Sequence, residues 1–148
     1  MKRLLIVLAI VLFFNIYVPL AGALESLYIC DNLPKSYKGN FSWYSDKVIH
    51  EFSIAITNLS SDSHGNVIAE GNGEFQVLQY VAKIRIKIQI TPATLRFEMW
   101  ELSPTDITVF LVTDGSYIGT ISQDLRTIKA VWTTISMGAQ GDLLLTAQ

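Results

Sequence analysis

Five aromatic residues have the side chains that point most directly to a binding function. Tryptophan and tyrosine combine a large apolar ring with one polar atom, and they are common in small-ligand pockets and at protein interfaces. They also fill the cores of small domains, and we expect a core position for at least two of the three tryptophans. The candidate ligand- or partner-binding residues are Trp43, Tyr80, Trp100, Tyr117 and Trp132.

A stripe of positive charge, formed by Lys83, Arg85 and Lys87, is a second candidate site. These residues alternate with isoleucines, so they share one face of a predicted strand. One interpretation is contact with an anionic partner, such as a lipid head group or a polysaccharide. The other is a solvated face whose charges oppose aggregation of the isoleucine-rich strand. The sequence favours the solvated face and keeps the anionic partner as the alternative.

The residue types that carry catalysis or bind metals lack the spacing that either role requires. His50 and Glu51 are neighbours in a predicted strand, so their side chains point to opposite faces, and we expect His50 at an interior or rim position. His64 lies in a polar loop, there is no Gly-x-Ser-x-Gly element, and a single cysteine with two distant histidines gives no zinc spacing. We therefore expect no enzymatic activity, no metal and no cofactor, with a hydrolase kept only as the third hypothesis.

Residues 1–23 have the three parts of a secretory signal peptide. Two cationic residues precede a long apolar run that ends at Ala21-Gly22-Ala23, the small-x-small pattern that signal peptidase recognises. The run is long enough to span a membrane as an uncleaved anchor, but Pro19 beside the small residues favours cleavage before Leu24. We predict a secreted or periplasmic protein that contacts the membrane only through the signal segment before cleavage.

Composition limits the class of the mature chain. Without Lys2 and Arg3, nine cationic side chains remain against 13 acidic ones, a net charge of −4. A mildly acidic chain does not have the basic stripe and high pI typical of proteins that bind nucleic acid. About 125 residues suffice for one hydrophobic core. Cys30 is the only cysteine, so no internal disulfide forms, and the thiol is either free or paired with a second copy.

Hydrophobic residues in the mature chain recur with a period of two. The clearest segment is 81–90, in which isoleucines alternate with Lys, Arg and Gln, as in a strand with one buried face. Turn residues divide the chain into about eight such segments. Because closure removes exposed strand edges, we predict a small antiparallel up-and-down β-barrel over residues 37–148, preceded by an arm at 24–36. A β-sandwich is the alternative.

Several local features make this prediction specific. Gly71-Asn72-Gly73 is interpreted as a turn between two strands. Residues 91–102 fit a strand better than a helix, and a turn of residues 91–94 would pair Ile88 with Phe97 and Lys87 with Glu98. For residues 122–134 we expect a helical turn near 123–126 that leads into a strand.

Asp114-Gly115 predicts a two-residue hairpin that joins strands 107–113 and 116–121. In that register Phe110 lies opposite Gly119, where the ring covers the glycine backbone. Leu111 and Ile118 point to the other face. Both faces of the hairpin would be apolar, which indicates an interface, an inserted arm or a ligand cavity in addition to the core.

The mature chain resembles the small secreted calycin barrels, the lipocalin and avidin-like families. The resemblance lies in strand number and in two segments, Gly39-Asn40-Phe41-Ser42-Trp43 and Ile128-Lys129-Ala130-Val131-Trp132. These families begin with Gly-x-Trp, whereas three residues separate Gly39 from Trp43 here. The resemblance implies a barrel fold and names no ligand.

The leading functional hypothesis is an exported, non-enzymatic binding module that holds a small apolar or amphipathic ligand or docks a protein partner. The alternative is a structural or assembly subunit that forms a homo-oligomer through the apolar hairpin. A ligand carrier should have an internal cavity lined by aromatic residues, whereas an assembly subunit should have a filled core and an external apolar patch.

Overall fold

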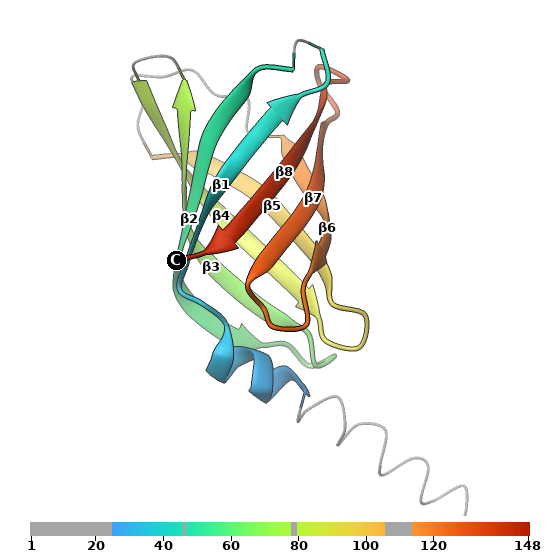
Figure 1. Cartoon of the computed structure of the whole chain (residues 1–148). Coiled ribbons are helices and arrows are strands. Elements are labelled where there is room, and N and C mark those ends of the chain that lie inside the picture. Colours follow the sequence, from blue (N-terminus) through green and yellow to red (C-terminus); the bar gives the residue numbers. More distant parts are fainter. Residues whose placement is uncertain (1–24, 46, 78–79, 106–113) are drawn as a thin grey trace, which may run out of the picture.

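The computed structural model describes residues 25–45, 47–77, 80–105 and 114–148, which are almost entirely β-structure (Figure 1). The strands follow one another around a closed barrel in sequence order, each antiparallel to its neighbours, and β1 completes the ring by pairing with β8. This confirms the predicted up-and-down barrel of eight strands and excludes the sandwich. The strands are β1 (Ser36–Trp43), β2 (Ile49–Ser61), β3 (Val67–Val77), β4 (Tyr80–Thr91), β5 (Arg96–Pro104), β6 (Gly115–Ile121), β7 (Thr127–Thr134) and β8 (Gln140–Ala147).

Alternation along each strand separates the core from the surface, as predicted. In β4 every second residue from Ala82 to Ile90 is buried, and the residues between them are exposed or half-buried. The same alternation in β8 buries Leu143 and Leu145. These inward side chains meet along the barrel axis, so apolar burial holds the fold together without a disulfide.

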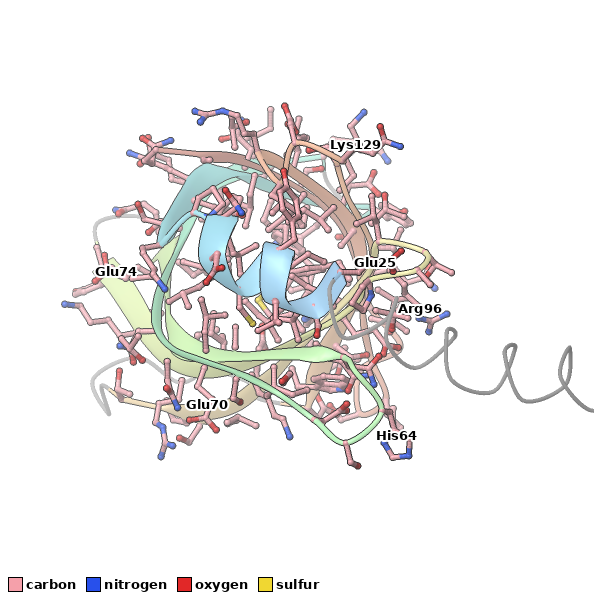
Figure 2. The ribbon with its side chains drawn as sticks, turned by 90° about the horizontal axis from the view of Figure 1, so that it is seen from below. Glu25, His64, Glu70, Glu74, Arg96 and Lys129 are labelled. Atoms are coloured by element: carbon pink, nitrogen blue, oxygen red, sulfur yellow. The ribbon has the colours of Figure 1, made fainter. Side chains whose placement is uncertain are left out.

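The two ends of the barrel differ. A short helix, residues 25–32, lies across one end, which we call the lower end; the connections 62–66, 92–95 and 122–126 surround it (Figure 1, Figure 2). Ile29 of the helix and Leu33 just after it are buried in the core. The segment predicted as a leading arm is thus a lid over the lower end. The opposite, upper end carries the connections 44–48 and 135–139.

The predicted turn at Gly71-Asn72-Gly73 is wrong, because β3 runs through it without interruption. The glycines have a steric role instead of a turning one. A Cβ at Gly71 would lie 2.1 Å from the carbonyl oxygen of Ala55 on β2, beside a bulge at Ile56 and Asn58. Glycine inside a strand often marks such a close backbone approach.

The β4–β5 hairpin has the predicted faces but not the predicted register. Ile88 lies opposite Met99 and Lys87 opposite Trp100, a shift of two residues that keeps every side chain on its expected face. Residue Leu95, with φ of 53°, makes the turn. Residues 96–104 are a strand, so the helical alternative is excluded. The strand β7 follows residues 122–126 as expected, but these residues form a turn with Leu125 at a φ of 58° instead of the expected helical turn.

The predicted hairpin at Asp114-Gly115 is also wrong. β6 pairs with β5 through Ser116–Thr120 on one side and with β7 along its whole length on the other, so neither edge is open to another strand. Phe97 of β5, rather than Phe110, lies opposite Gly119. Phe110 and Leu111 fall outside the described residues, as does the predicted signal peptide. Within the described part of the chain, no helix is both long and apolar enough to cross a membrane.

Candidate ligand-binding site

Aromatic rings from β1, β6 and β7 gather inside the upper half of the barrel. Strand alternation directs Phe41 and Trp43 inward together from the end of β1. The ring centroids of Trp43 and Trp132 lie 4.9 Å apart at 89°, and Phe41 lies 5.0 Å from Trp43 and 5.7 Å from Trp132. Tyr117 adds a fourth ring, 6.4 Å from Trp132. Such edge-to-face contacts are the favoured geometry for aromatic pairs.

β2 and β3 extend this cluster across the barrel. Phe75 lies 5.6 Å from Phe41 and 6.0 Å from Phe52, measured between ring centroids. His50 stands beside Phe75 at 5.1 Å, and its Nδ1 lies 3.2 Å from the carbonyl oxygen of Gln76. His50 is therefore a half-buried histidine on the inward face near the rim, in agreement with the sequence-based expectation.

A carboxylate enters the same aromatic region from β5. Glu101 follows Phe97 and Met99 on the inward face, and its Oε1 accepts a 2.8 Å hydrogen bond from the Tyr117 hydroxyl. Burial raises the pKa of Glu101 to about 6, against the opposing effect of hydrogen bonding from Tyr117 and Trp132. Burial and the neighbouring Glu101 raise the pKa of Tyr117 well above its usual value. The site thus combines an acid that titrates near neutral pH with a tyrosine that stays protonated.

The indole nitrogen of Trp132 lies close to this carboxylate. Trp132 is 4% exposed, and its Nε1–H makes no hydrogen bond of normal geometry with the described residues. Gly115 allows the approach, because a Cβ there would lie 2.0 Å from Trp132 Nε1 and 2.9 Å from Glu101 Oε2. A buried donor without a good partner costs free energy, so natural proteins keep few of them.

Asp114 fixes the chain next to this site. Its carboxylate accepts hydrogen bonds from the Thr134 hydroxyl and from the backbone N–H of Ser136, the latter at 2.8 Å. These bonds lower the pKa of Asp114. They tie the start of β6 to the β7–β8 connection, and so hold Gly115 in place under the Trp132 indole.

The structure divides the five predicted aromatic candidates into two groups. Trp43, Tyr117 and Trp132 meet in the upper interior, as described above. Trp100 faces outward on β5, opposite Lys87 and Ser116, and Tyr80 is 54% exposed at the upper end of β4. Three of the five therefore form one candidate site, and the other two do not join it.

The basic stripe lies on the outer face of β4, next to acidic residues of β3. Glu70 lies opposite Lys87 in the register, and Glu74 lies opposite Lys83, with which it forms a 3.3 Å ion pair. Arg85 lies opposite Asn72. The neighbouring carboxylates offset much of the positive charge, so the arrangement favours the solvated face over an anionic partner.

The outer face of β6, β7 and β8 carries a shallow groove of about 340 Å³. Its exposed apolar residues are Ile118, Val131 and Leu144, at 45%, 39% and 48% exposure. Ile118 and Val131 are direct cross-strand neighbours. Lys129 and Asp142 border the groove. This is an external apolar patch, separate from the aromatic interior.

Sequence reasoning missed Glu101, the most informative residue of the site. The signal was present, because Phe97, Met99 and Glu101 share one strand face and a carboxylate is out of place on an apolar face. Phe41 and Phe75 were also missed, since phenylalanine on an inward face looks the same in a core and in a binding site.

No family model matches this sequence, and a search of the curated proteins finds no match. Within the described residues, no three His, Cys, Asp or Glu side chains gather as metal ligands would. The barrel is compatible with a calycin-like architecture, and the function has to be inferred from the site.

Proposed function

We propose that this chain is an exported, non-enzymatic binding module that holds a small amphipathic ligand in the upper interior of the barrel. The signal-peptide pattern supports export to the periplasm or the cell exterior. Eight-stranded barrels enclose just enough space for side chains or for one small ligand, and barrel mouths are common ligand sites. Membership of the lipocalin or avidin-like families is the finer form of this proposal, supported by strand number alone.

The pair formed by Glu101 and Trp132 carries the proposal. A barrel that needed only stability would fill this region with apolar side chains, as it does around Ile88 and Leu145. Here a carboxylate is buried with a pKa raised to about 6, beside an indole N–H that lacks a good partner. Such polar groups among aromatic rings are typical of sites that orient a ligand.

Native mass spectrometry of the mature protein, purified gently from its own host, tests the proposal. We expect a monomer that carries one additional small mass. Trp132→Leu should lose that mass, whereas Trp100→Leu, on the outer face, should retain it. Protein that is always free of ligand, or a mass that both variants retain equally, would contradict a site in the upper interior.

The external groove supports a second candidate function, self-assembly. Ile118, Val131 and Leu144 form an apolar patch that a second copy of the chain would cover. This proposal predicts a ligand-free dimer or larger ring in the same mass spectra, and its conversion to monomer by Val131→Lys. The assembly surface expected from sequence, the Asp114-Gly115 hairpin, is replaced here by the outer face of β6–β8.

A further inference from the structure

We infer that the ligand of the upper interior is an organic cation, an amine or quaternary ammonium group attached to an apolar body. This inference rests on the proposed function and specifies its ligand class. It depends on the charge of Glu101, the rings around it and the Trp132 indole N–H, whose contact with Glu101 falls short of normal hydrogen-bond geometry.

The first argument is charge. Glu101 brings a carboxylate into the upper interior, and no ion pair in the described chain involves it. The three ion pairs that the described residues form all lie on the outer faces of the strands. A buried carboxylate without a counter-charge is unfavourable, and a bound cation would supply the missing charge. An anionic ligand would instead meet repulsion from Glu101.

The second argument is the surrounding rings. The centroids of Phe41, Trp43, Tyr117 and Trp132 lie within 4.9–6.4 Å of one another in the pairs that make contact. Aromatic faces attract cations through their quadrupoles, and tryptophan does so best. Several rings beside one carboxylate are the usual composition of sites that bind quaternary ammonium groups.

The third argument is the indole of Trp132. Its Nε1–H is almost fully buried and lacks a good partner, although it lies close to Glu101. When the ammonium group of the ligand pairs with the Glu101 carboxylate, the Trp132 indole N–H can donate a hydrogen bond to an acceptor atom of the ligand next to the positive charge. The pair therefore fits a ligand in which an ammonium group lies near an oxygen atom.

The charge argument also makes binding depend on pH. Among the described residues, Tyr117 and Trp132 face Glu101, Asp114 adds a weaker repulsion, and the β4 residues Ile84 and Ile86 are apolar. His50 is a further titratable group that faces inward in the upper half. With the pKa of Glu101 near 6, about a tenth of the carboxyl is ionised at pH 5 and nearly all at pH 8. Cation binding should therefore be about tenfold weaker at pH 5 than at pH 8.

Choline and 3,3-dimethyl-1-butanol, which have the same shape and differ in charge, test the inference with the mature protein. Binding is measured from the shift of the Trp132 indole N–H signal in NMR spectra, with the Trp100 signal as the reference on the outer face. At pH 8 we expect choline to bind at least about tenfold more tightly than the alcohol, with the preference almost lost at pH 5.

Two variants separate the role of Glu101 from general effects. Glu101→Gln should remove the preference for choline and its pH dependence, so that choline and the alcohol bind with similar affinity at both pH values. Glu98→Gln lies on the same strand and faces outward, and it should behave as the wild type. A pH dependence that persists in Glu101→Gln would belong to another group and would overturn the inference.

The outcomes distinguish this inference from the proposed function. Equal binding of choline and the alcohol would overturn the cation and leave the ligand site standing. If neither probe binds but the host-purified protein still carries a small mass, the cation is likewise overturned and the ligand site stands. Failure of both probes together with ligand-free protein would overturn the inference and the proposed function.

Discussion

The two ends of the barrel differ in how well their buried polar groups are hydrogen-bonded. At the lower end, the buried Tyr37 hydroxyl donates a 2.6 Å hydrogen bond to the Leu125 carbonyl, in the same core cluster as Ile29 of the helix. At the upper end, Tyr117 is bonded to a carboxylate of raised pKa, and the Trp132 indole has no good partner. The buried hydroxyl of the lower end is thus satisfied by a backbone carbonyl, whereas the upper end keeps a carboxylate of raised pKa beside an indole N–H without a hydrogen bond of normal geometry.

Loss of the helix contacts should have the largest effect on the fold. Leu33→Ala and Ile29→Ala each remove a fully buried side chain from the lower end, and we expect each to lower the free energy of unfolding by about 2–5 kcal/mol. Urea unfolding followed by circular dichroism measures this. Leu27→Ala, at a position 57% exposed, is the matched control and should change stability by less than about 0.5 kcal/mol. Equal stability of all three variants would show that the helix is not part of the cooperative fold.

Replacement of the Glu101 carboxylate should raise the free energy of unfolding instead of lowering it. The pKa of Glu101 is raised by folding, so its ionisation destabilises the folded state as pH rises from about 4.5 to about 6. Glu101→Gln should therefore equal the wild type in stability at pH 4 and exceed it by up to about 2 kcal/mol at pH 8. Urea unfolding at both pH values gives the difference. A variant that is less stable than the wild type at pH 8 would mean that the carboxylate supports the fold.

The two buried tyrosines should respond differently to removal of the hydroxyl, and these effects are the smallest. Tyr37→Phe loses a satisfied hydrogen bond and leaves the Leu125 carbonyl unpaired, so we expect a loss of about 1 kcal/mol that is the same at pH 4 and pH 8. Tyr117→Phe removes the donor that favours ionised Glu101, so its effect should grow with pH. If the stability loss depends on pH in the same way for both variants, the two ends of the barrel do not differ in how they hold a buried hydroxyl.

The strand number and the buried faces were predictable, because alternation of apolar and polar residues is a local pattern. β4 shows this best, since each of its inward residues was identified from the sequence. The β4–β5 register was not predictable in the same way, because a shift of two residues preserves both faces. The turn residue Leu95 has a positive φ, which leucine rarely adopts and no sequence signal marks.

The candidate site was predictable only in part, because it depends on which strands become neighbours. Trp43, Tyr117 and Trp132 were candidates by residue type, but only barrel closure pairs β1 with β8 and so brings Trp43 near Trp132 of β7, the next strand. The pairing of β5 with β6 places Glu101 beside Tyr117, and the sequence indicated a different partner for β6. The helix at 25–32 is short, and its role as a lid follows from contacts with the barrel rather than from its own sequence.

The titration of Glu101 tests the account most directly, because the proposed site depends on a buried carboxylate. Carbon-13 NMR of the side-chain carboxyl, in mature protein free of ligand, gives its midpoint without any assumption about the ligand. We predict a midpoint near pH 6 that moves to lower pH when choline is added. A midpoint at the ordinary value near 4.5, unchanged by choline, would mean that Glu101 is in contact with water and that the upper interior is not a binding site.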